Sequence, residues 1–194
     1  MKDTSAAIVE CAFWLFIERG YEGASMAALV SATGLSKGAF YHHFRDKDAL
    51  HDAAIDYFFL RFLGSGEPPP EPLADEGLDA VLEDLCGGYV HLMEAISTVA
   101  PDRVAYYRFV FSILPKVKDH IRGQIAHGRR RVAAAVRRDQ EQGRLVASLL
   151  PETIADHCLA LIEGTALLCV IEGRQDIAAA LGGSLASYRR LLAS

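Results

Sequence analysis

The run TGLSKGAFYHHF, residues 33–44, constrains the fold of this chain more than any other stretch. Gly34 fits the positive φ that a tight turn requires, and the Ser36 hydroxyl can accept a hydrogen bond from the backbone two or three residues later. A short helix is therefore predicted to begin directly after this turn. Phe40 and Phe44 stand four residues apart on that helix and share one face, so both are expected to point into a core.

The flanking segments complete a small helical head. Residues 5–19 carry apolar side chains at spacings of four, seven and eight, which predicts an amphipathic helix that ends at Gly20. A second helix is predicted from Ser25, its N-cap, to Gly34, and Asp46 is expected to cap a fourth helix. Two short helices joined by a glycine-containing turn form a helix-turn-helix motif, whose second helix enters the major groove of DNA. The sequence therefore predicts a DNA-binding head.

From about Ile8 to Leu50 the chain resembles the TetR family of bacterial transcriptional regulators, in the run AFWLFIERGYEGASMAALVSATGLSKGAFYHHFRDKDAL. The resemblance implies an all-α fold with an N-terminal three-helix head, expected over residues 1–50. A C-terminal helical domain for ligand binding and dimerisation is expected over residues 51–194. It further implies a homodimeric repressor that binds a palindromic double-stranded DNA operator and is released by a small-molecule effector.

The family's DNA contacts are carried over by position in the motif. Gly38 fits such a contact because a missing side chain lets the backbone come close to DNA. Other roles remain open, since Ser36 caps a helix with or without DNA, and Tyr41 and His42 could be half-buried packing residues. The expected DNA-binding residues are Ser25, Ser36, Lys37, Gly38, Ala39, Tyr41, His42, His43 and Lys47.

Two departures from the family pattern have structural consequences. Ala24 and Ala28 replace a hydroxyl and an acidic residue that family members usually carry, so the reciprocal capping box of the second helix is lost. Phe13 and Trp14 stand where polar residues are more usual. This face of the first helix is therefore expected to be covered by another element.

Behind the head, the prolines of residues 64–72, GSGEPPPEP, predict an extended loop. Residues 62–102 carry nine acidic and no basic side chains, whereas arginines cluster at 129–138. Pairing between these helices explains the asymmetry, and binding of an anionic effector is the alternative. The net charge of −5 argues against indiscriminate binding to nucleic acid. Body helices are predicted at about residues 73–99, 102–116, 118–142, 151–172 and 176–193.

The run CLALIEGTALLCVI, residues 158–171, is apolar on nearly every side, so one of its faces is expected to meet a second partner. A membrane span is the rival interpretation, but Glu163 interrupts the run, which is shorter than about 20 residues. Together with the last helix it would form a four-helix interface between two chains. The predicted dimer contacts are Cys158, Ile162, Ala166, Val170, Leu181, Leu185 and Tyr188.

Aromatic residues in the body favour an apolar or aromatic effector. The predicted pocket residues are Tyr89, Met93, Tyr106, Tyr107, Phe109 and Phe111, with His157, His91 or Arg108 as polar anchor. Each of these is also an ordinary core or surface residue in the alternative interpretation.

Enzymatic functions are disfavoured. The four cysteines are widely spaced without metal-ligand spacing, and the sequence shows no nucleotide-binding loop or nucleophile elbow. The sequence therefore predicts no catalytic residue, no metal and no cofactor, and the lack of a signal peptide predicts a cytoplasmic protein. A helical small-molecule binding protein with a vestigial DNA-binding head is the alternative function.

Overall fold

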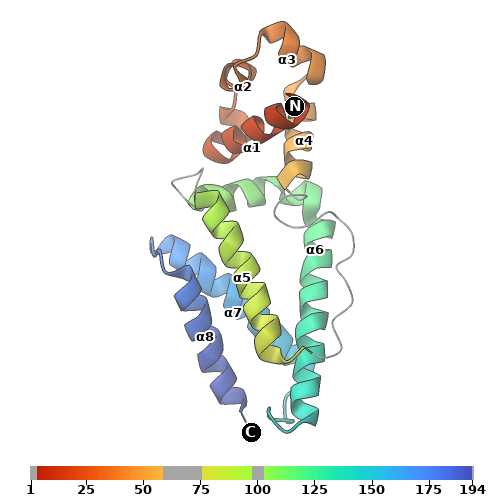
Figure 1. Ribbon diagram of the computed structural model, residues 1–194, viewed down its shortest axis with the longest axis vertical. Coiled ribbons are helices and arrows are strands. Elements are labelled where there is room, and N and C mark those ends of the chain that lie inside the picture. The colour runs from red at the N-terminus through yellow and green to blue at the C-terminus, as the bar shows by residue number, and fades with distance from the viewer. Residues whose placement is uncertain (1–3, 59–75, 98–102, 194) are drawn as a thin grey trace. The chain divides into compact units, whose positions relative to one another are not determined.

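The computed structural model describes residues 4–58, 76–97 and 103–193, and every regular element within them is a helix (Figure 1). The predicted all-α fold is confirmed. The chain divides into two compact units, unit 1 (Met1–Glu67 with Ala95–Val117) and unit 2 (Pro68–Glu94 with Lys118–Ser194). The predicted domain boundary after residue 50 stays a prediction. The helices are α1 Thr4–Gly23, α2 Met26–Thr33, α3 Lys37–His43, α4 Lys47–Phe58, α5 Leu78–Ser97, α6 Val104–Glu141, α7 Pro151–Ile171 and α8 Ile177–Leu192.

In unit 1, α1 packs against α2 and α4 through the apolar stripe that its sequence predicts. Ile8, Ala12 and Phe16 of that stripe are buried. Gly20 has φ 71° and interrupts the helical backbone, so residues 21–23 form a separate turn beyond the predicted end. The positive φ explains why a glycine stands there.

The expected cover over the first helix is the N-terminal part of α6. The Phe13 ring lies 5.6 Å from the Tyr57 ring of α4 and 5.5 Å from the Phe109 ring of α6, centroid to centroid. Phe13 is fully buried, and Trp14 is half-buried with its ring 4.5 Å from that of Phe13. An aromatic cluster therefore joins three helices of unit 1.

In unit 2, α7 packs against α8. Gly143, with φ 70°, follows the end of α6, and Pro151 occupies the first turn of α7, as the sequence predicts. The loop between these helices is tied to the end of α8, because the Val146 N–H donates to the Leu192 carbonyl at 2.8 Å. Length and apolar composition alone would let α7 cross a membrane, a test that core helices of soluble proteins also meet.

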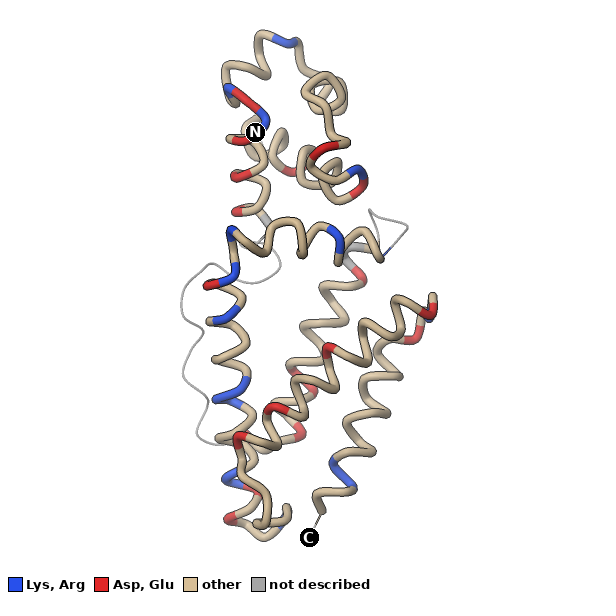
Figure 2. Tube along the Cα trace, turned by 180° about the vertical axis from the view of Figure 1, so that it is seen from behind, with Lys and Arg blue, Asp and Glu red and all other residues tan. Residues whose placement is uncertain are grey.

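The arginines of α6 in unit 2 pair with carboxylates on neighbouring elements, and Figure 2 shows the basic residues along α6 beside acidic residues on α5 and α7. Arg131 binds Glu76 at 2.9 Å and Asp84 at 2.5 Å, which confirms the predicted pairing with the acidic segment. Two further arginines pair instead with α7, as Arg129 with Asp156 and Arg137 with Glu152. Carboxylates of the same chain therefore already pair with most arginines of this cluster.

Two predicted helix boundaries are wrong. α6 continues through residue 117, where a break was expected, because Pro115 lies inside the helix and removes one backbone hydrogen bond without ending it. α5 begins at Leu78, whose N–H donates to the buried Asp139 carboxylate of α6 at 3.4 Å. A tertiary contact therefore sets this helix start. The predicted loop at residues 64–72 lies outside the described residues.

Candidate functional site

The turn between α2 and α3 has the geometry that the sequence predicts. Ser25 caps α2, with its Oγ accepting from the Ala28 N–H at 3.2 Å. Gly34 adopts the left-handed conformation at φ 68° and ends the helix. The Ser36 Oγ then accepts from the Ala39 N–H at 3.2 Å and begins α3. Short-range hydrogen bonds therefore fix where α3 starts.

Only one side of α3 is held in the core of unit 1. Phe40 is fully buried, whereas the predicted contact residues of this helix are all exposed. Phe44 is half-buried and takes an extended backbone at φ −133°, so it ends α3 and does not share the buried face as predicted. The exposed residues are Ser36, Lys37, Gly38, Ala39, Tyr41, His42 and His43.

The exposed side of α3 combines cationic and aromatic groups. The Lys37 Nζ lies 6.0 Å from the centroid of the Tyr41 ring, and the His42 and His43 rings lie 5.6 Å apart. Lysine ammonium, tyrosine hydroxyl and imidazole groups can donate hydrogen bonds to phosphate oxygens or base edges. This face is therefore chemically suited to a nucleic acid.

The start of α4 adds a positioned lysine. The Nζ of Lys47 lies 4.1 Å from the centroid of the Tyr21 ring. The Tyr21 hydroxyl donates to Asp48, and this bond raises the pKa of Tyr21 to about 12, with burial contributing less. Asp46 caps the helix by accepting from the Ala49 N–H at 2.8 Å, so this backbone N–H already has an acceptor.

Comparisons with known proteins agree with this geometry. A family model described as "Bacterial regulatory proteins, tetR family" matches residues 8–54, which include α2, the turn and α3. This head, residues 8–54, belongs to the TetR family.

Relatives of this chain include named repressors. The HTH-type transcriptional repressor Rv1474c of Mycobacterium tuberculosis is 40% identical over 70 residues, which are 36% of this chain and 34% of that protein. The chain thus matches about a third of that relative. The repressor DhaR of Mycobacterium sp. strain GP1 is 24% identical over 87% of this chain and 83% of its own length. A TetR transcription regulator structure from Haloarcula marismortui aligns over the whole of both chains with a TM-score of 0.67 and 18% identity.

His51 of α4 makes the stability of the head pH-dependent. The ring is buried between Phe16 and Tyr21, with centroids 4.9 and 4.7 Å away, and its Nε2 has no partner among the described residues. Burial, helped by Lys116, lowers the pKa of His51. The unfolded chain therefore binds this proton more tightly, so the stability that neutral His51 contributes is full above its ordinary pKa and falls as the pH drops below it.

We expect the unfolding free energy of unit 1 to decrease as the pH falls below about 6.5, the ordinary histidine pKa, by at most about 1.4 kcal/mol per pH unit from this group. Urea unfolding followed by the fluorescence of Trp14, the one tryptophan of the chain, measures it. His51→Gln should flatten the slope. An unchanged slope in that variant would assign the pH dependence to other groups.

The structure distributes the predicted pocket residues over both units. Tyr89, His91, Met93 and His157 belong to unit 2, and the five others to unit 1. Phe109 and Tyr106 are buried in unit 1, whereas Phe111 is 64% exposed. His157 is exposed, and its Nδ1 lies 2.7 Å from the Tyr188 hydroxyl in a hydrogen bond. Their role in ligand binding stays a prediction. Within the described ranges, no group of three or more His, Cys, Asp or Glu residues could hold a metal ion.

The structure buries most of the predicted dimer contacts within one chain, and their role in a dimer stays a prediction. Tyr188 is half-buried, but the other six side chains are buried within a single chain. A side chain that its own chain already buries has little surface left for a partner. The large apolar side chains of α7 that are exposed are Leu167, Leu168 and Ile171. The six buried residues are Cys158, Ile162, Ala166, Val170, Leu181 and Leu185.

Proposed function

We propose that this chain is a homodimeric transcriptional repressor that binds a palindromic operator through α3 of each subunit. The observation that carries the proposal is the two-sided character of α3. Ser36 caps this helix, Phe40 on one side is buried, and the opposite side is exposed. Lys37 and Tyr41 on that side, with Ser25 and Lys47 at the starts of α2 and α4, would contact DNA. The named repressors among the relatives support the same function.

The proposal of a homodimer is supported by the exposed face of α7. Leu168 and Ile171 are 57% and 69% exposed, and Leu167 lies beside them. Contiguous exposed apolar side chains mark interaction sites more often than free surface. A twofold pair of chains would place two α3 helices on major-groove faces about 34 Å apart, or a multiple of that spacing.

We further propose that a small effector releases the protein from its operator. The protein would act in the cytoplasm, where operator DNA is accessible. An effector that favours a different spacing of the two heads would lower operator affinity. By linkage, operator DNA must lower the affinity for the effector by the same factor.

Selection of bound sites from random duplex DNA by the purified protein tests this function. We expect enrichment of a palindrome, and an affinity whose logarithm falls with log salt by about 0.9 per phosphate contacted. Enrichment of a single half-site would contradict the dimer. No enrichment at low salt would favour a small-molecule binding protein whose head, with its few cations, has lost DNA binding.

A further inference from the structure

We infer that unit 2 binds an amphipathic anion, with an extended apolar body and a carboxylate or phosphate at one end, in the groove between α5 and α8. Two adjoining cavities of about 310 and 430 Å³ share Asp79, Ala186 and Arg189. Both have mainly apolar walls; the lining of the first, here called the apolar cavity, includes one arginine, and that of the second includes three. The groove includes none of the pocket residues that the sequence predicts. A role of this molecule as effector rests on the proposed function, whereas its binding does not.

The apolar cavity is a channel between two helix faces. Its α5 side runs from Asp79 to Val90 at spacings of three and four residues, a length of about 16 Å at about 1.5 Å per residue. Glu83 is the one carboxylate of this cavity besides Asp79. A Cβ at Gly182 on the α8 side would meet nothing within 4 Å, so there is open space in front of it. The apolar lining is Leu82, Cys86, Val90, Ala178, Gly182, Leu185 and Ala186.

The second cavity is positively charged. Three arginines and one carboxylate line it, a formal charge of 3 − 1 = +2. Arg144 also binds Asp139 at 2.5 Å, and Arg189 binds Asp79. When the carboxylate of Asp139 is included, the formal charge of the cavity is +1. Arg190 is exposed and donates to the Ser187 hydroxyl at 3.1 Å, with no carboxylate partner among the described residues. An anion entering this cavity would therefore meet an uncompensated guanidinium.

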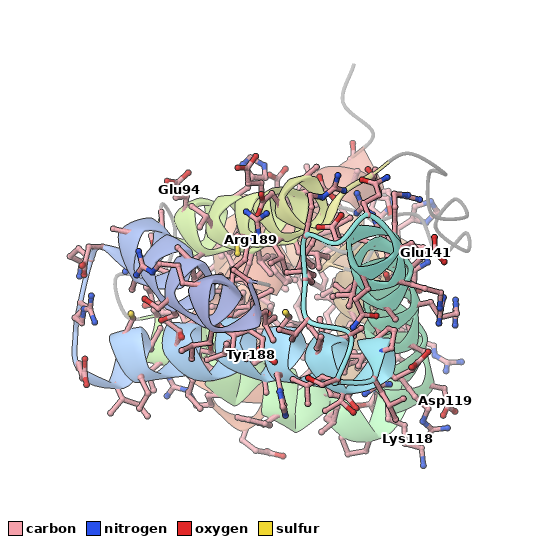
Figure 3. All side chains as sticks on the ribbon, turned by 90° about the horizontal axis from the view of Figure 1, so that it is seen from below. Glu94, Lys118, Asp119, Glu141, Tyr188 and Arg189 are labelled. Atoms are coloured by element: carbon pink, nitrogen blue, oxygen red, sulfur yellow. The ribbon has the colours of Figure 1, made fainter. Side chains whose placement is uncertain are left out.

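Arg189 stands where the two cavities meet. Figure 3 shows it on the side of α8 that faces α5, whereas Tyr188 faces α7. The Nε of Arg189 is buried and finds no acceptor in the described part of the chain. A buried N–H without a partner is unfavourable, and the guanidinium fork matches the oxygens of a carboxylate or phosphate. These observations place the anionic group beside Arg189 and Arg190 and the apolar body along α5 and α8.

Calorimetric titration with decanoate, decyl phosphate and decylamine, each below its micelle concentration, tests the ligand class. The three share one apolar chain and differ in the head group. We expect the anions to bind with a dissociation constant of about 1 mM or tighter, and decylamine at least about tenfold more weakly. Binding of only one anion would assign the head group as carboxylate or phosphate. Binding of neither, or tighter binding of decylamine, would overturn the inference.

Two variant pairs locate the site. Gly182→Leu fills the channel and should abolish decanoate binding. Gly88→Leu is the matched control, because Gly88 is also an exposed helical glycine with open space in front of it but does not line the cavity. This variant should bind decanoate as the wild type does. Arg190→Gln should weaken binding about tenfold, whereas Arg137→Gln, which removes an exposed arginine outside the groove, should not. Unchanged binding in Gly182→Leu, or equal loss in its control, would refute this location.

Operator affinity separates this inference from the proposed function. If decanoate binds in the groove but the selected operator is bound equally well with and without it, the site stands and its effector role fails. If calorimetry detects decanoate but no duplex is ever enriched, the DNA-binding function fails and the site again stands.

Discussion

Phe13→Ala is expected to destabilise unit 1 by about 3–5 kcal/mol, a large part of the stability of a typical domain. The ring is fully buried and lies within 6 Å, centroid to centroid, of Trp14, Tyr57 and Phe109. Truncation removes the contacts that join α1 to α4 and to the first part of α6. The cavity left behind can close only if these helices shift. Urea unfolding followed by Trp14 fluorescence reports this region directly.

Phe111→Ala is the matched control for this prediction. Phe111 lies two residues after Phe109 on α6, but its side chain is 64% exposed. The same truncation there should change stability by no more than about 0.5 kcal/mol. A cost of less than about 1 kcal/mol for Phe13→Ala would show that the aromatic cluster does not hold unit 1 together.

Local hydrogen-bond chemistry explains why the α2–turn–α3 segment could be predicted from sequence. Ser25, Gly34 and Ser36 each act on backbone groups within three residues, so their effect does not depend on the rest of the fold. The same holds for Asp46 at the start of α4. The starts of these helices and the exposed side of α3 follow from such residues.

Contacts between distant segments were not predictable in the same way. A cover over Phe13 could be expected from its apolar character, but nothing in the sequence names Phe109, ninety-six residues later, as the partner. Tyr21 beneath Lys47 is a similar case, because these residues meet only once α1 and α4 pack.

The sequence could not show which face of α7 is buried within its own chain. A run such as residues 158–171 is apolar all round, so its periodicity does not distinguish the face toward α8 from the face left exposed. Cys158 and Ile162 were assigned to the interface and lie in the core, while Leu168 and Ile171 are exposed. Only the packing of α7 on α8 decides between them.

Ala39→Glu is expected to lower operator affinity at least about a hundredfold, or about 2.7 kcal/mol, while leaving the head folded. Ala39 is the third residue of α3, and its N–H already donates to the Ser36 hydroxyl. A glutamate at this position can accept from the Ser36 N–H in return, which completes a capping box and places a negative charge favourably at a helix N-terminus. The same carboxylate would face the phosphates and base edges that the exposed side of α3 is proposed to approach, where like charges repel strongly.

Ala39→Gln separates charge from shape in this experiment. Glutamine forms the same capping box and has nearly the same size, but carries no charge. Its operator affinity, measured by fluorescence anisotropy on the selected duplex, should fall by no more than about tenfold, the effect of one imperfect contact. Both variants should unfold at or above the wild-type midpoint by circular dichroism. Equal operator affinities for the two variants would mean that the first turn of α3 lies away from DNA. A loss confined to the glutamate variant would place that turn against the negatively charged duplex.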